Sequence, residues 1–158
     1  MAPAVRAGVA DIDEDLLMHD PSAAQNDIIS EFGLFSDWMD RYQYLIDLGR
    51  KLPPLDAQEM IDSNLLDGCQ SRVWLIIEGT KNKMTIRANS DAAIVSGLIA
   101  LLIRVYSGTS AREIVETEAF FIKEIGLSEH LSATRANGLH AMLTSIRGAA
   151  LKMLSAGA

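Results

Sequence analysis

Cys69 is the one cysteine in the 158-residue sequence, and it lies in a short polar segment, residues 67–71, that reads DGCQS. A thiolate is a strong nucleophile, but a free thiol with a pKa of about 8.5 is only slightly ionised at neutral pH. Arg72 could favour the thiolate, whereas Asp67 opposes it. Since no histidine lies beside Cys69 in the sequence, cysteine-hydrolase chemistry is disfavoured. Exchange at sulfur, which needs only a thiolate and access, fits better.

A lone cysteine also excludes several kinds of site. An internal disulfide needs two thiols, and zinc ribbons and four-cysteine iron–sulfur clusters need several thiolates from one chain. The three histidines show no ligand spacing, so we expect neither a metal site nor a resident cofactor. Two interpretations of Cys69 remain: a small buried apolar side chain, or a reactive thiol presented by a turn. Gly68, which lets another backbone approach the sulfur, favours the second.

Composition limits the classes of partner. The chain is 49% hydrophobic and 22% charged, as in a globular protein, and its net charge is −7. This charge disfavours binding to nucleic acid or to an anionic membrane surface. The N-terminus has no apolar signal-peptide core, and the longest apolar stretch, residues 92–106, contains polar residues. We therefore expect a cytoplasmic protein whose partners are proteins or small molecules.

The N-terminal third predicts a tail followed by helix. Residues 1–25 are expected to form a flexible acidic N-terminal tail, and residues 26–158 the folded domain. Ser36 is a possible N-cap, and Gly49 a stop, for a helix with one apolar stripe. That stripe contains Trp38, Tyr42, Leu45 and Ile46. A short helix at residues 56–61 is also expected.

The rest of the chain predicts one hairpin and several helices. A β-hairpin is predicted at about residues 71–88. The sequence there has a run rich in β-branched and aromatic residues, then a turn, then a segment in which polar and apolar residues alternate. Ser90 is expected to cap a buried central helix, and the Ser110–Glu113 capping box to start another. A last helix runs from about 132 to 154, although Asn-Gly at 137–138 is a turn signal inside it. We predict an α+β fold in which helices cover a small antiparallel sheet.

Four ordered segments carry a family resemblance. Residues 68–74, GCQSRVW, resemble the G-C-x-S-x-V-W signature of SufE-type cysteine desulfuration proteins (SufE/CsdE). Residues 44–53 look like that family's tyrosine-rich helix, 90–100 its central helix start, and 131–139 its L-[ST]-x-x-R-x-x-G-L element. The resemblance runs from about residue 26 to 154 and implies the SufE/IscU-like fold.

The resemblance also implies a function. A PLP-dependent cysteine desulfurase of the SufS or CsdA type would pass persulfide sulfur to Cys69, and the chain would stimulate that enzyme. An iron–sulfur scaffold of the SufBCD type would then receive the sulfur from Cys69. The chain would act as a carrier, holding a transient persulfide, with PLP belonging to the desulfurase. The acceptor loop of the family matches Gly68, Gln70 and Ser71. The positions that flank this loop and the desulfurase-docking face match Asp91 and Arg135. A monomer or weak homodimer is expected.

Two functional alternatives remain at this stage. The first is an IscU-like iron–sulfur assembly scaffold, although scaffolds of that kind normally present several cysteines. The second is a lone-thiol hydrolase or peroxidase, which would consume its substrate without a partner.

The flanking residues also have alternative interpretations. Asp91 suits a helix N-terminus whatever the function, and Arg135 suits a surface salt bridge. We hypothesise that Leu65, Leu66 and Trp74 shelter a persulfide, with simple anchoring of the loop as the alternative for the two leucines.

Overall fold

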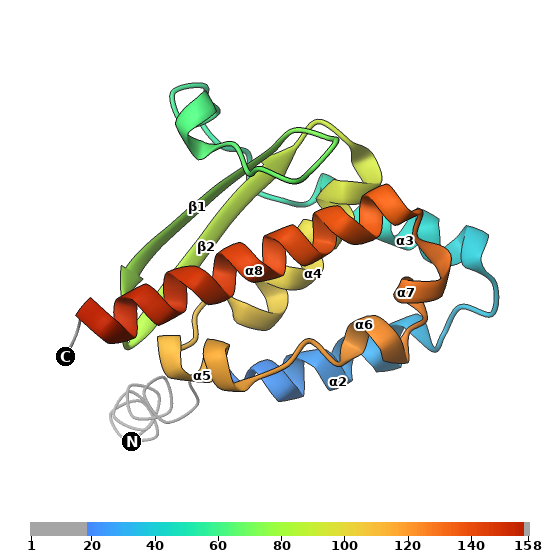
Figure 1. The fold of residues 1–158 in the computed structure, drawn as a ribbon. Helices are drawn as coiled ribbons and strands as arrows, with labels where there is room; N and C mark the ends of the chain where they lie inside the picture. Colours follow the sequence, from blue (N-terminus) through green and yellow to red (C-terminus); the bar gives the residue numbers. More distant parts are fainter. Residues whose placement is uncertain (1–18, 157–158) are drawn as a thin grey trace, which may run out of the picture.

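The computed structural model describes residues 19–156 and has one small sheet among helices (Figure 1). The elements in chain order are α2 (Pro21–Phe32), α3 (Trp38–Arg50), the 3-10 helix η1 (Asp62–Asn64), β1 (Val73–Thr80), β2 (Lys83–Ser90), α4 (Ala93–Tyr106), α5 (Ala111–Glu116), α6 (Phe121–Glu124), α7 (Leu127–His130) and α8 (Ala133–Ala156). The predicted α+β class with a small antiparallel sheet is confirmed.

The sheet is a two-stranded antiparallel hairpin, with Thr80 opposite Lys83 at the turn and Val73 opposite Ser90 at the open end. Side chains alternate between its faces, as the strand geometry requires. The residues of β2 that alternate into the core are Met84, Ile86 and Ala88. The predicted hairpin is confirmed, and the paired strands extend to residue 90.

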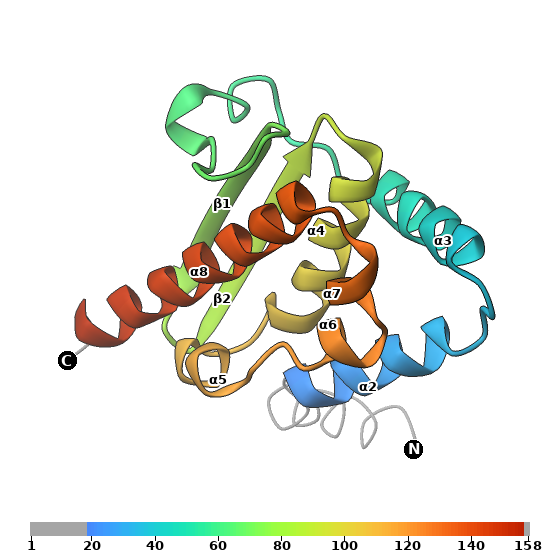
Figure 2. The ribbon, with the colours of Figure 1, turned by 45° about the vertical axis from the view of Figure 1, so that its right-hand side comes forward.

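Two helices cover the inner face of the hairpin. α4 packs on β2, and α8 crosses the same face close to β1 (Figures 1 and 2). α3 crosses α4 at two glycines: a Cβ on Gly97 would lie 2.2 Å from the carbonyl oxygen of Leu45, and one on Gly49 2.7 Å from the amide nitrogen of Gly97. Among the described residues, no helix is both long and apolar enough to cross a membrane.

The N-terminal boundary of the folded domain differs from the expected one. Asp20 caps α2, because its carboxylate accepts the Ser22 N–H at 2.9 Å, and Pro21 occupies the first helical position. The side chain of Gln25 is buried, donates to the carbonyl oxygen of Glu118 and accepts the N–H of Phe121. Residues 21–25 therefore belong to the domain, whereas residues 1–18 of the expected tail lie outside the described residues.

Three local predictions are also corrected. Ser90 ends β2, because it pairs with Val73, and the N-cap of α4 is Ala92. Residues 57–61 form turns ahead of η1 in place of the expected helix, and the cap of α3 is Asp37. The Asn-Gly pair at 137–138 lies inside α8. The Ser110–Glu113 cap is confirmed, with the Ser110 Oγ accepting the Glu113 N–H at 3.1 Å.

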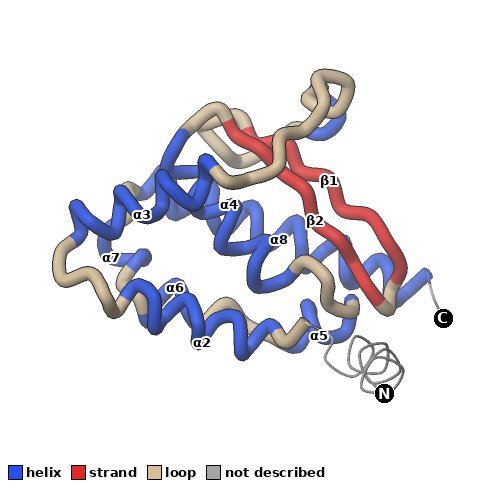
Figure 3. The backbone as a smooth tube through the Cα atoms, turned by 180° about the vertical axis from the view of Figure 1, so that it is seen from behind, coloured by secondary structure: helices blue, strands red, loops and turns tan. Residues whose placement is uncertain are grey.

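The connection from α3 to β1, residues 51–72, projects beyond the open end of the hairpin (Figure 3). Polar contacts from Arg87 and Asn89 hold its first part against β2. The Asn89 Oδ1 accepts the Leu55 N–H at 2.7 Å, and the guanidinium of Arg87 pairs with the Glu59 carboxylate at 2.5 Å. These contacts anchor the segment that leads into the Cys69 loop.

Candidate functional site

The Cys69 loop, residues 65–72, is held to the hairpin at both ends. At its start, the Leu66 N–H donates to the carbonyl oxygen of Val73 at 2.9 Å. At its end, the Asp91 carboxylate accepts the Arg72 N–H at 3.1 Å, and the Asp91 N–H donates to the Arg72 carbonyl oxygen at 3.3 Å. Between them Gly68 has φ +90°, a left-handed conformation that glycine adopts without strain. The result is a tight turn with fixed ends.

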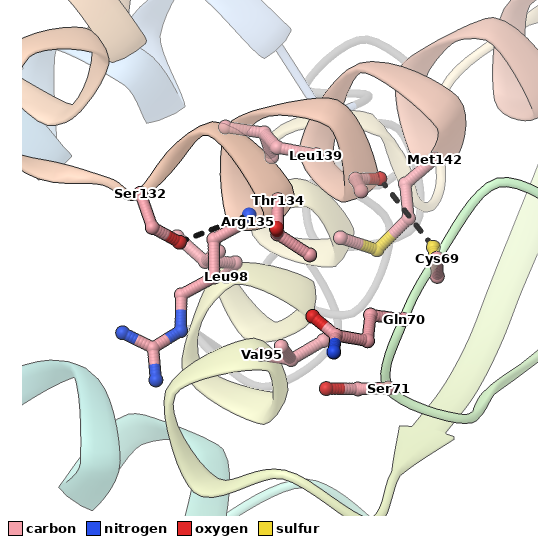
Figure 4. A pocket seen from close by; sticks show the side chains of 11 residues that line it. Cys69, Gln70, Ser71, Val95, Leu98, Ser132, Thr134, Arg135, Leu139 and Met142 are labelled. Atoms are coloured by element: carbon pink, nitrogen blue, oxygen red, sulfur yellow. Dashed lines mark hydrogen bonds between the residues drawn. The ribbon is translucent and has the colours of Figure 1, made fainter.

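The sulfur of Cys69 points from this loop toward α8 (Figure 4). The thiol is partly buried and its Sγ donates to the carbonyl oxygen of Gly138 at 3.7 Å. Burial raises the pKa of the Cys69 thiol, because a thiolate loses solvation there. Burial is the cause of this rise, and it opposes the thiolate that a nearby positive charge was expected to favour. In this position the sulfur is held as a protonated thiol.

A cavity of about 350 Å³ opens beside the sulfur, between the Cys69 loop, α4 and the first half of α8 (Figure 4). Its apolar side chains come from the two helices and are Val95, Leu98, Leu139 and Met142. Its polar side chains come from the loop and the start of α8 and are Gln70, Ser71, Ser132, Thr134 and Arg135. The thiol therefore faces a chamber that is apolar on one side and polar on the other.

The structure brings most of the sequence-selected residues to this chamber. Cys69, Gln70, Ser71 and Arg135 line it together, although Arg135 is 66 residues from Cys69 in the chain. Gly68 lies beside it, where a Cβ would be 3.4 Å from the Cβ of Ala141 on α8. Asp91 does not line the chamber; its contact is with the backbone of Arg72 at the end of the loop.

Arg135 lies in the first turn of α8 and is exposed. Its N–H donates to the Ser132 Oγ at 3.3 Å, which agrees with the expected start of this helix near residue 132. Within residues 19–156 its guanidinium forms no ion pair, so the salt bridge considered as an alternative is not made in the described part of the chain. The charge at the rim is left available to a partner.

The apolar residues beside the thiol differ from those we hypothesised. Leu65 and Leu66 line a separate hollow with Ser145, and the chamber next to Cys69 takes its apolar lining from α4 and α8. Trp74 pairs with Leu65 across an isolated β-bridge. The loop leucines thus anchor the loop, and the sequence reasoning missed the helix residues, above all Gly138, that surround the sulfur.

The described residues contain no group of three or more His, Cys, Asp or Glu side chains arranged to hold a metal ion. The thiol is therefore the feature of this chamber with the clearest chemistry. The half-buried sulfur lies on a tight loop and faces a chamber with room for further atoms. This arrangement suits a thiol that carries a second sulfur atom.

Comparison with known proteins shows which family the chain belongs to. Residues 26–150 match the model of the SufE family, described as an Fe-S metabolism associated domain. An uncharacterized SufE-like protein of Rhizobium meliloti (strain 1021) is 41% identical over 128 residues, which cover 78% of this chain and 91% of that protein. A second uncharacterized SufE-like protein, from Rhizobium etli, is 42% identical over 130 residues, 79% of this chain and 88% of that protein.

A solved structure shows the same fold. The solution structure of a hypothetical protein from Thermus thermophilus superposes with a TM-score of 0.68 at 21% identity, covering 84% of this chain and 96% of that one. The chain belongs to the SufE family, and its role is in iron–sulfur metabolism. The resemblance drawn from the four sequence segments is confirmed.

Proposed function

We propose that this protein is a sulfur acceptor and carrier: it takes persulfide sulfur from a PLP-dependent cysteine desulfurase of the SufS or CsdA type onto Cys69 and stimulates that enzyme. The observation that carries the proposal is the position of Cys69, the one thiol of the chain, on a tethered loop at a chamber of about 350 Å³. Family membership supports the link to iron–sulfur metabolism.

The proposed step is an exchange at sulfur. The Cys69 thiolate attacks the outer sulfur of the desulfurase persulfide, the new S–S bond forms on Cys69, and the desulfurase thiolate leaves. Attack requires the thiolate, yet burial raises the pKa of the Cys69 thiol in the seated conformation. For transfer, the Cys69 loop therefore moves away from α8. This movement breaks the contact between the Cys69 Sγ and the Gly138 carbonyl oxygen.

Partner contacts in this proposal come from the rim of the chamber. Arg135, which has no ion-pair partner within residues 19–156, offers its positive charge to a desulfurase carboxylate. Gln70 and Ser71 present the loop. Asp91 governs how firmly the loop is held, because its carboxylate binds the Arg72 N–H. PLP belongs to the desulfurase, and this chain supplies only the thiol.

After loading, the carrier would release its sulfur to a scaffold of the SufBCD type in the cytoplasm. With the loop in the position seen here, the persulfide would lie beside the apolar side chains of the chamber, which would limit its contact with soluble oxidants or reductants. Shielding of the cargo between two partners is what distinguishes a carrier from an enzyme that consumes its substrate.

Intact-mass measurement tests the proposal. Purified protein is incubated with the desulfurase, PLP and L-cysteine, and a mass gain of about 32 Da, one sulfur atom, is expected in the wild type. Cys69→Ser should show none, while Ser30→Ala, a change at an exposed serine of α2 outside the chamber, should still be loaded. A gain that persists in Cys69→Ser would overturn the proposal. Turnover of a substrate without the desulfurase would favour a hydrolase or peroxidase, and bound iron would favour a scaffold.

A further inference from the structure

Two glycines lie inside α8, at positions 138 and 148. A glycine in the middle of a helix destabilises it relative to alanine, because glycine has more backbone freedom to lose. Neither residue has the positive φ that would require a glycine. Within residues 19–156 the glycines with positive φ are Gly68, Gly79, Gly108 and Gly126. Some other constraint must therefore explain the absence of a side chain.

The two glycines have different surroundings. A Cβ built on Gly138 would lie 3.5 Å from the Cys69 Sγ, the one heavy atom within 4 Å among residues 19–156 when the two chain neighbours and the nearby α8 backbone are set aside. A Cβ built on Gly148 would meet no atom of residues 19–156 within that distance, by the same criterion. Gly138 is buried and lines the chamber, and its carbonyl oxygen accepts from the Cys69 Sγ. Outside α8, a side-chain atom at position 138 would thus meet the sulfur and no other atom of the described residues.

Contact at 3.5 Å is ordinary packing for a bare thiol, so the unloaded protein could tolerate a methyl group at position 138. A persulfide carries an outer sulfur about 2 Å from the Sγ. The chamber must therefore leave free space next to the Sγ for the outer sulfur. A methyl group on the wall of the chamber beside the Sγ removes part of that space. Overpacking of this kind disfavours the seated form.

We propose that Gly138 is a positioning residue for the persulfide: the missing side chain leaves room for the outer sulfur while the Gly138 carbonyl oxygen holds the Cys69 sulfur. This inference rests on the proposed function, since it assumes that Cys69 carries a persulfide. It adds a residue whose role concerns the loaded form specifically. A methyl group at this position should leave the accessibility of the unloaded Cys69 thiol nearly unchanged. It should make the persulfide on Cys69 more accessible to solvent.

The test compares Gly138→Ala with Gly148→Ala, which makes the same change in the same helix at a position where the added methyl group meets no described atom within 4 Å. The persulfide is made without the desulfurase, in two exchanges: the Cys69 thiolate attacks a small symmetrical disulfide, which releases one small thiolate and leaves a mixed disulfide. Hydrosulfide then attacks the Cys69 sulfur of the mixed disulfide, displaces the second small thiolate and leaves Cys69–S–SH. Dithiothreitol then discharges it. One thiolate takes the outer sulfur and frees the Cys69 thiolate, and the second thiol displaces hydrogen sulfide as the reagent closes to its cyclic disulfide.

The readout is the ratio of the persulfide discharge rate to the alkylation rate of the unloaded thiol. We expect Gly138→Ala to raise this ratio about tenfold, and Gly148→Ala to leave it unchanged. A loosened loop would raise both rates together and leave the ratio unchanged, which would overturn the proposal, as would an equal or slower discharge. Thermal unfolding of both variants verifies that each remains folded. Because loading is chemical, a failure of the desulfurase to load Cys69 would count against the proposed function alone.

Discussion

The two halves of α8 contain similar residues in different surroundings. The first half has Arg135 and Gly138, which line the chamber beside Cys69. The second half has Arg147 and Gly148. Arg147 lines a hollow with Tyr106, and a Cβ on Gly148 would meet none of the residues that the structure describes within 4 Å. Both arginines are exposed, and within residues 19–156 neither forms an ion pair.

This difference shows that residue type alone does not mark the site. Position 138 matters because the Cys69 loop lies on it, and position 148 has no such neighbour. The same holds for the charges, since only Arg135 shares a chamber with the thiol. The two halves therefore provide matched variants, in which the same substitution is made with and without the sulfur nearby.

The arginine pair gives the largest expected difference. We expect Arg135→Gln to weaken stimulation of the desulfurase about tenfold, because a charge at the rim of the chamber is lost to a partner carboxylate. Arg147→Gln removes the same charge from the far half and should change stimulation less than about twofold. The measurement is the rate of alanine formation from L-cysteine at several carrier concentrations. Equal effects of the two variants would remove the distinction between the halves.

A smaller effect is expected from the tether of the loop. Asp91→Ala removes the acceptor of the Arg72 N–H, and a net loss of about 1 kcal/mol should raise the alkylation rate of Cys69 about fivefold. Asp37→Ala is the control, because it removes a similar bond from carboxylate to backbone N–H at the start of α3. That variant should lose stability but keep the alkylation rate of the wild type. Unchanged alkylation in Asp91→Ala would show that the tether does not limit access to the thiol.

The smallest effect concerns pH. Burial raises the pKa of the Cys69 thiol in the folded state, so folding favours the protonated form. This contribution to stability is fully present below the pKa of the unfolded thiol, about 8.5, and is lost as pH rises through the folded value. Urea unfolding should therefore show wild type losing stability relative to Cys69→Ser above about pH 8.5. Parallel curves for the two proteins would contradict burial of the thiol.

Sequence patterns predicted the elements whose signals are local. The hairpin follows from a β-branched run, and the cap at Ser110 from its spacing to Glu113. The start of α2 also had a local signal, Asp20 followed by Pro21, but the acidic composition before residue 26 outweighed it in our interpretation. Ser90 failed as a cap because pairing with Val73 keeps it in the sheet.

The site was predicted only in part, because its walls come from distant segments. Family motifs selected Cys69 and Arg135, which the fold brings to one chamber. The apolar lining from α4 and α8 depends on how these helices cross the sheet, which no local pattern encodes. Gly138 illustrates the limit: as part of an Asn-Gly pair it indicated a turn, yet it lies in a continuous helix beside the sulfur. A glycine inside an apolar helical repeat was the available signal for a packing constraint.

Delivery of sulfur to a cluster tests the central claim most directly. The desulfurase, L-cysteine, iron and an assembly scaffold are combined with wild type, with Cys69→Ser or with no carrier, and cluster formation is followed by absorbance. We expect cluster formation to be accelerated by the wild type, and Cys69→Ser to match the reaction without carrier, because serine cannot hold a persulfide. Equal rates with Cys69→Ser and wild type would contradict the account.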